Sequence, residues 1–334
     1  MSNIALFGVH QQGLDIVRHL GAKGINVSCL VTLSESMAEK SKAAGWVDYA
    51  PFAREHGLDI YSCRSYSLKH ADDIAFLERS AFDIVLLGGW QRLIPEVAIN
   101  CVKYAIIGQH GSSEFLPRGR GRSPLSWCVM ENRRRLVWNL FEVAPGIDNG
   151  RLLATEIFDI NEWDDARTLY YKVSIVVKQM LERVIPKLLT GELQGIEQEG
   201  EPTFYRKFTP DDRKIDWGSS IYSIYNTVRA STRPYPGAFT TLNGVQYSVW
   251  KAQVFDTKIT YQNVKLGEIV EVFDGGDLLV HGADGLLLIR DSEIPGQVGD
   301  VLGYGTVAQR KEQTGVGLIQ RNEGFSDPPT PHMT

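Results

Sequence analysis

The feature that most constrains the fold is a change of hydrophobic pattern along the chain. In the first half, short continuous apolar runs alternate with segments of helical periodicity. These patterns predict buried strands at 4–7, 25–31, 83–87 and 104–107, with helices at 13–20, 34–44 and 95–102. Strands that are apolar on both faces are typical of a parallel sheet covered by helices. We therefore expect an open, doubly wound and mostly parallel α/β sheet.

Two more strands, at 136–143 and 152–158, are expected before a long amphipathic helix. Asp164 or Asp165 is placed to cap that helix, and Gly191 to end it. Its apolar positions recur at helical spacing: Leu169, Val173, Val176, Met180, Val184, Ile185 and Leu188. Such a stripe predicts a helix that packs on the sheet.

After Gly191 the composition changes. A polar stretch at 195–200 and a helix at 221–230 precede a region of short strands. Asn243-Gly244 is typical of a tight hairpin turn, and further strands are expected at 267–273, 278–280 and 286–290. This pattern predicts a small, OB-like β-barrel. We expect an α/β domain over 1–200, a linker and helix over 201–235, the β domain over 236–312 and a disordered tail over 313–334.

Composition excludes several classes of protein. The chain has 35 Lys and Arg against 40 Asp and Glu, so its net charge of −5 disfavours a broad nucleic-acid surface. The four cysteines form no CxxC pair, and we see no metal-ligand spacing. There is no signal-like N-terminus and no apolar run long enough for a membrane span. We expect a cytoplasmic protein without a metal site.

Four segments carry candidate chemistry. Gly8 to Gly13 follows the first strand but lacks the GxGxxG pattern, so a tight strand–helix turn is favoured over a dinucleotide site. Gly88-Gly89-Trp90-Gln91 follows the 83–87 strand, where α/β sheets bind ligands; an ordinary turn with a packed Trp is the equal alternative. His110 and Asp148 lie in glycine-flanked segments and together could form a His–carboxylate pair for general-base catalysis.

These segments resemble the folate-dependent formyltransferases, a family that includes methionyl-tRNA, glycinamide ribonucleotide and sugar N-formyltransferases. The resemblance covers most of residues 1–310. In the first part of the chain it rests on His110, Ser112, Leu116-Pro117, Arg120-Gly121, Pro124 and Gly146-Ile147-Asp148-Asn149-Gly150. In the later part it rests on Lys214 to Trp217, Val228 to Ala230 and Pro236 to Ala238. It implies a Rossmann-like catalytic domain, with 10-formyltetrahydrofolate as formyl donor and a primary amine as acceptor.

The resemblance also implies roles for individual residues. His110 would move the proton of the attacking amine, with Asp148 fixing its tautomer. The pterin would lie against Gly88, Gly89, Trp90, Gln91, Arg92, Leu93, Val143, Ala144, Pro145, Gly146, Ile147 and Asp148. The family's oxyanion-holding Asn is replaced by Gly108, and two extra residues follow Ser112. Gln109 is the expected substitute for the Asn, with backbone amides of 111–113 as the alternative.

The acceptor side is expected at Ser112, Arg118, Arg120 and Arg122, because arginines in a glycine-rich loop suit a phosphate or nucleotide. A solvated basic loop is the alternative. The motif is most similar to that of the sugar enzymes, which implies a nucleotide-linked amino sugar for surface polysaccharide, with the pseudaminic acid route as one match. Methionyl-tRNA formyltransferase and a non-catalytic folate- or sugar-binding homologue are the alternatives. A homodimer is left open.

Overall fold

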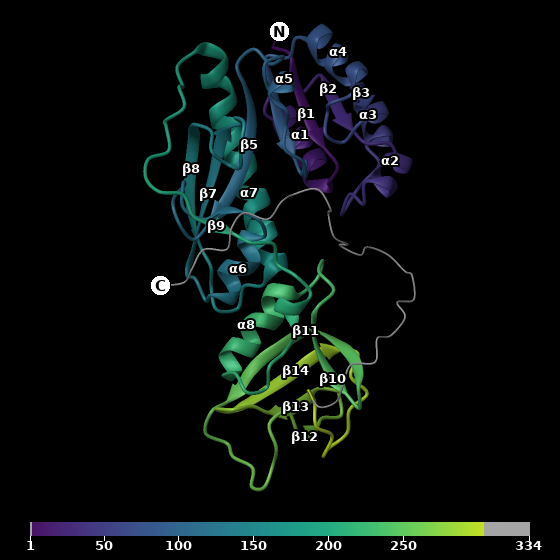
Figure 1. The fold of residues 1–334 in the computed structure, drawn as a ribbon, viewed down its shortest axis with the longest axis vertical. Coiled ribbons are helices and arrows are strands. Elements are labelled where there is room, and N and C mark those ends of the chain that lie inside the picture. Colours follow the sequence, from purple (N-terminus) through teal and green to yellow (C-terminus); the bar gives the residue numbers. More distant parts are fainter. Residues whose placement is uncertain (1, 304–334) are drawn as a thin grey trace.

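The computed structural model describes residues 2–303. The expected disordered tail, together with the last residues of the expected β domain, lies outside the described residues. Two layered units follow one another along the chain, and Figure 1 shows them at opposite ends of the molecule, with α8 (Ile221–Ser231) between the two sheets. The exact domain limits stay a prediction.

The first unit is built on a seven-stranded sheet in the order β3-β2-β1-β4-β5-β7-β8. The first five of these strands are parallel, and β7 and β8 are antiparallel to their neighbours. The strands are β1 (Ile4–Gly8), β2 (Cys29–Thr32), β3 (Asp59–Ser62), β4 (Ile84–Gly88), β5 (Ala105–Ser112), β7 (Arg135–Glu142) and β8 (Leu152–Asp159). The predicted doubly wound, mostly parallel sheet is confirmed.

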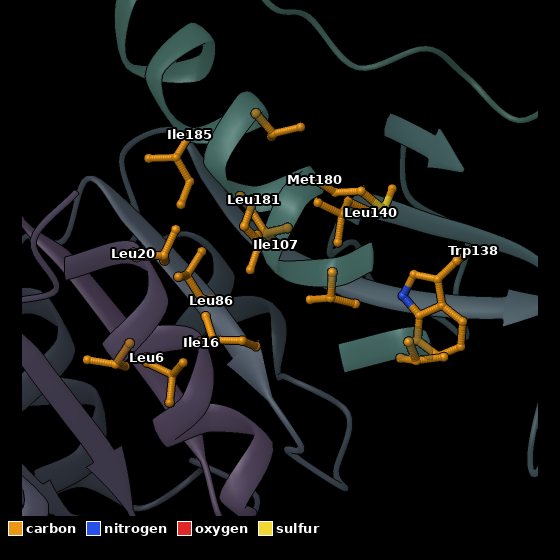
Figure 2. Close-up of a cluster of buried hydrophobic side chains, with 14 of the residues drawn as sticks. Leu6, Ile16, Leu20, Leu86, Ile107, Trp138, Leu140, Met180, Leu181 and Ile185 are labelled. Atoms are coloured by element: carbon orange, nitrogen blue, oxygen red, sulfur yellow. The ribbon is translucent and has the colours of Figure 1, made fainter. Parts of the chain in front are cut away.

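Helices cover both faces of this sheet. The strand β1 is apolar throughout because its side chains are buried on both faces. Ile4 and Leu6 enter one core, whereas Ala5 and Phe7 enter the core on the other face. The first core contains side chains of α1 (Gln11–Ala22), α3 (Ala50–His56), α6 (Pro124–Met130) and α7 (Ala166–Thr190). Figure 2 shows Leu20 of α1 near Leu181 and Ile185 of α7 in this core, with Ile16 beside Leu86. The second contains side chains of α2 (Glu35–Lys40), α4 (Ala71–Ser80) and α5 (Glu96–Ile99).

The second unit is an antiparallel five-stranded sheet in the order β10-β11-β14-β13-β12, consistent with a small barrel. Its strands are β10 (Ala238–Leu242), β11 (Val245–Asp256), β12 (Ile269–Val272), β13 (Leu278–His281) and β14 (Leu286–Ser292). Asn243 and Gly244 both have positive φ, as the tight hairpin turn between β10 and β11 requires. The predicted β domain is confirmed.

A short parallel ladder ties the linker to the α/β unit. β6 (Arg120–Gly121) pairs with β9 (Phe204–Tyr205), and a 3₁₀ turn (Asp211–Arg213) follows before α8. Among residues 2–303, no helix combines the length and the apolar character that a membrane span requires. The same residues hold no cluster of three or more His, Cys, Asp or Glu side chains arranged for a metal ion.

Candidate active site

His110 lies within β5. The expected strand ended at residue 107, but pairing with β7 continues the strand to Ser112 and sets His110 opposite Asn139. The His110 side chain is only 8% exposed. Its Nδ1 lies 3.2 Å from Asp148 Oδ2, and its Nε2 lies 2.7 Å from the Gly119 carbonyl oxygen. The predicted pair of His110 and Asp148 is therefore in contact.

Asp148 reaches the imidazole from the turn between β7 and β8. Its backbone is in the left-handed region, with φ of 49°. The same Oδ2 that faces His110 accepts a hydrogen bond of 3.2 Å from the Gly121 amide. One carboxylate oxygen thus contacts the catalytic candidate and the loop that carries Gly119.

Gln109 lies on the other face of the sheet from His110, because successive side chains of a strand alternate. Its neighbour two residues back, Ile107, enters the first core (Figure 2). The Gln109 Nε2 donates to the Leu87 carbonyl oxygen at 3.0 Å, and its Oε1 is buried with no partner in the described part of the chain. The structure therefore does not bring this amide to the imidazole, and its oxyanion role stays a prediction.

Gly108 has no room for the side chain that the family resemblance implies. A Cβ at this position would lie 2.7 Å from Phe141 Cζ and 3.0 Å from Val143 Cγ2. Phe141 is opposite Gly108 in the β5–β7 ladder and is buried. An aromatic ring thus fills the space beside His110 where an Asn would project, and the strand is intact because the residue here is glycine.

The two segments predicted to hold the pterin both border β5. The Val143 amide donates to the Ile106 carbonyl of β5. The carbonyl of Leu87, which directly precedes Gly88-Gly89, accepts a hydrogen bond from the Gln109 side chain of β5. Of the 88–93 segment, Trp90 is buried, with its ring 5.9 Å from Phe7. The packed-Trp alternative describes this geometry, and the other members of the segment remain the candidate ligands.

The side chain of Gln91 is engaged with the first strand–helix turn. Its Nε2 contacts His10 Nε2 at 2.7 Å and donates to the Ala44 carbonyl at 2.9 Å. Burial lowers the pKa of His10, with the Ala44 hydrogen bond acting in the opposite direction. The Arg92 guanidinium lies over the Tyr66 ring, at 4.7 Å from its centroid. The 88–93 segment is thus held in place by its own side chains.

The predicted acceptor residues are not equivalent. Ser112 is 1% exposed, and its Oγ closes a turn with the backbone of Glu114. The Arg118 guanidinium is largely exposed near Glu114, and Arg120 donates to Gln198 Oε1 from Nε and Nη2 at 3.2 and 2.7 Å. Burial lowers the pKa of Arg120 and the Asp148 charge opposes this, yet an arginine remains charged at neutral pH.

A cavity of about 320 Å³ opens beside the Arg118–Gly119 loop. Gly119 separates it from His110, because the carbonyl of Gly119 accepts the His110 contact while the residue also lines the cavity. The lining is rich in arginine and aromatic side chains and consists of Glu114, Arg118, Gly119, Trp127, Glu131, Arg133, Thr203, Phe204, Tyr205 and Arg206. Arg120 and Arg122 are not among them. The cavity is a concave, partly cationic surface within reach of the catalytic candidate.

Sequence reasoning missed the contribution of the segment between α7 and β9. Thr203 accepts a hydrogen bond from the Gly119 amide through Oγ1 and another from the Arg120 amide through its carbonyl, and Gln198 contacts both loops at His110. These residues lie 48 or more positions from their partners, in a polar stretch without periodicity. No local signal could have identified them.

Residues 3–185 match the family model described as formyl transferase, and residues 207–298 match the model of the formyl transferase C-terminal domain. The chain belongs to the formyl transferase family. The matches cover the α/β unit with the His110–Asp148 pair and most of the β unit, so the family resemblance found in the motifs is confirmed.

Solved structures share this fold at low sequence identity. A variant of HypX from Aquifex aeolicus is 17% identical with a TM-score of 0.64, covering 86% of this chain and 45% of HypX. An N-formyltransferase from Helicobacter canadensis, in complex with folinic acid and dTDP-3-aminofucose, is 14% identical with a TM-score of 0.61, covering 90% of this chain and 100% of that one. Methionyl-tRNA formyltransferase from Clostridium thermocellum is 19% identical with a TM-score of 0.55, covering 78% of this chain and 96% of that one. The chain spans a little under half the length of HypX.

Proposed function

We propose that the chain is a cytoplasmic enzyme that transfers the formyl group of 10-formyltetrahydrofolate to the primary amine of a nucleotide-linked amino sugar. The observation that carries the proposal is the buried contact between His110 and Asp148 within the family's catalytic domain. A His–carboxylate pair moves protons near neutral pH, and amine formylation requires a proton to leave the attacking nitrogen.

The donor is proposed from the family and its neighbours. The Helicobacter canadensis structure holds folinic acid, and a HypX structure was solved with tetrahydrofolic acid. In this chain, the Gln109 Oε1 is buried beside the Leu87 backbone without a partner among the described residues, so an acceptor is available to an amino group of the pterin. The segments 88–93 and 143–148 would hold the pterin. When bound, 10-formyltetrahydrofolate supplies an activated formyl group on N10.

The chain's own residues would handle the proton. As the amine nitrogen bonds to the formyl carbon and the bond to N10 breaks, one proton passes from the amine to N10. Asp148 contacts His110 Nδ1 and so fixes the ring, which leaves Nε2 as the nitrogen that exchanges the proton. The Gly119 carbonyl faces that Nε2, so acceptor binding is expected to open this contact.

The cavity beside Gly119 supports a nucleotide-linked acceptor. Arg118, Arg133 and Arg206 supply cationic groups, and Trp127 and Tyr205 supply aromatic surface. Such a lining suits a phosphate-bearing group whose amine reaches His110 past Gly119. Amino sugars of the pseudaminic acid route are among the first acceptors to test, and a homodimer stays a prediction.

The test is formyl transfer from labelled 10-formyltetrahydrofolate to a panel of nucleotide-linked amino sugars, with initiator Met-tRNA as a parallel acceptor. His110→Ala should lower kcat by roughly 10²–10⁴, the usual contribution of a general acid–base group. His281→Ala, in β13 of the second unit, is the matched control and should retain the wild-type rate.

Near-normal kcat in His110→Ala would reject the catalytic assignment. Turnover of Met-tRNA alone would replace the sugar acceptor by the tRNA alternative. Folate or sugar binding without turnover of any acceptor would favour the non-catalytic homologue.

A further inference from the structure

The side chain of Gln198 joins the two loops that flank His110. Its Nε2 donates to the carbonyl oxygens of Asp148 and Gly150, at 2.8 and 2.7 Å. Its Oε1 accepts from Nε and Nη2 of Arg120. One half-buried amide therefore uses both its donors on the turn that carries the carboxylate and its acceptor on the loop that carries Gly119.

Each of these loops supplies one contact to the imidazole. The turn brings Asp148 to Nδ1, and the loop brings Gly119 to Nε2. Thr203, five residues after Gln198, holds the same loop through the Gly119 and Arg120 amides. The linker stretch from Gln198 to Thr203 thus fixes both sides of His110 from outside the sheet.

The contact between Asp148 and His110 depends on this arrangement, and it is long for a hydrogen bond. The Asp148 carboxylate lies 3.2 Å from His110 and 3.2 Å from the Gly121 amide, the long end of hydrogen-bond range. The residue also has a positive φ, which Asp adopts more readily than most L-residues but which its surroundings must still favour. The hydrogen bond from Gln198 to the Asp148 carbonyl is such a restraint.

We propose that Gln198 is a positioning residue of the formyl transfer reaction, holding the Asp148 turn and the Arg120 loop in register around His110. It acts through its bonds to Asp148, Gly150 and Arg120. The kinetic part of this inference rests on the proposed function, whereas the geometric part concerns the imidazole–carboxylate contact alone.

Gln198→Glu separates the two halves of the amide's role. A carboxylate still accepts from Arg120 but cannot donate to the Asp148 and Gly150 carbonyls, and it places negative charge against them. We expect kcat to fall roughly 10- to 100-fold, because displacement of a catalytic group by about 1 Å costs that much. The acceptor KM should stay within about threefold, because Arg120 keeps its partner.

Two further variants complete the kinetic experiment. Gln198→Ala also removes the partner of Arg120, so kcat should fall and the acceptor KM should rise. Gln194→Glu makes the same exchange on an exposed side chain of the same segment between α7 and β9 and should behave as the wild type. Thermal unfolding midpoints of all four proteins show whether any loss of rate comes from a loss of fold. Unchanged kcat in Gln198→Glu would overturn the proposal.

Proton NMR supplies a measurement that needs no turnover. An imidazole N–H bonded to a carboxylate gives a downfield, exchange-protected signal, which is assigned to His110 by its loss in His110→Ala. We expect it in the wild type and in Gln194→Glu, and we expect it to be lost in Gln198→Glu. Its absence from the wild type or its persistence in Gln198→Glu would overturn positioning. If no acceptor is formylated while the signal behaves as expected, the proposed function fails and the positioning inference stands.

Discussion

At the scale of the residue, the extension of β5 decides which side chains can meet. His110 and Gln109 are adjacent in sequence, yet strand alternation sends them to opposite faces of the sheet. Residues on the His110 face meet the turn of Asp148, whereas Gln109 bonds to the end of β4. With Phe141 packed over Gly108, the surroundings of the imidazole contain the carboxylate but no side-chain amide of β5.

This geometry makes a prediction for Gln109→Ala. We expect kcat to fall by less than tenfold, because the amide lies across the strand from His110, and the free energy of unfolding to fall by about 1 kcal/mol as the bond to Leu87 is lost. Steady-state kinetics and urea unfolding measure both quantities. A rate loss of roughly 10²–10³ would instead assign Gln109 the oxyanion role, since that is the usual effect of removing an oxyanion donor.

At the scale of the element, α7 shows how local chemistry sets a boundary. The Asp165 side chain accepts from the Thr168 amide at 2.8 Å, and the Thr168 hydroxyl accepts from the Asp165 amide at 3.0 Å. This reciprocal pair is a capping box, which satisfies backbone donors at the start of the helix. At the other end, Gly191 adopts the left-handed conformation of a helix terminator.

Asp165→Ala should therefore lower the free energy of unfolding by about 1 kcal/mol, the typical cost of losing an N-cap. Urea unfolding should show a lower midpoint with an unchanged slope. Glu192→Ala, just beyond the helix and exposed, is the control and should leave the midpoint unchanged. An unchanged midpoint in Asp165→Ala would mean that packing alone sets this helix start.

The same element explains what the sequence could predict. α7 and its two caps, the strand β1 and the Asn243-Gly244 hairpin all carry a local signal, and all are confirmed. The strand β3 at the edge of the sheet is mostly exposed, so it has no continuous apolar run, and it was not predicted. The end of β5 is polar and glycine-rich, and it is a strand only because β7 pairs with it.

The residues of the candidate site also fall into two groups, those that the sequence predicted and those that it did not. His110 and Asp148 were predicted from motifs whose residue types declare their chemistry, and the structure brings them together. Gln198 and Thr203 act through single side-chain bonds to distant loops, which leave no spacing or periodicity in the sequence. Positioning residues of this kind become visible only when tertiary contacts are known.

At the scale of the whole molecule, α8 belongs to both units. Ile221 and Val228 pack in the core of the β unit, whereas Ala230 packs in the first core of the α/β unit. Figure 1 shows the helix next to α6, whose Ser126 hydroxyl donates to the Ala230 carbonyl. The two units therefore share a helix rather than a flexible connection, and their stabilities should be coupled.

Arg229 supplies the polar part of that coupling. The residue is 4% exposed, and its guanidinium donates to the carbonyls of Asn161 and Asp164 at 3.1 and 2.9 Å, in the segment that leads into α7. Nη2 reaches Asn132 Oδ1, and Nε donates to Asn226 Oδ1 on its own helix. Burial lowers the pKa of this guanidinium, with the neighbouring Tyr225 acting in the opposite direction. The guanidinium is bound by acceptors from two loops of the α/β unit, in addition to Asn226 on its own helix.

Arg229→Met should uncouple the two units. Methionine fills much of the volume but removes the Arg229 bond to the Asp164 carbonyl, at about 1–3 kcal/mol for a buried group that loses its partner, whereas the Asn161 carbonyl keeps the Asp164 amide as a donor. Calorimetry of the wild type should show one cooperative transition, and that of the variant should show two, with the β unit and the α/β unit melting separately. Arg54→Met, on an exposed side chain of α3, should keep the single transition. A single transition at the wild-type temperature in Arg229→Met would show that the apolar contacts of α8 couple the two units without the buried guanidinium.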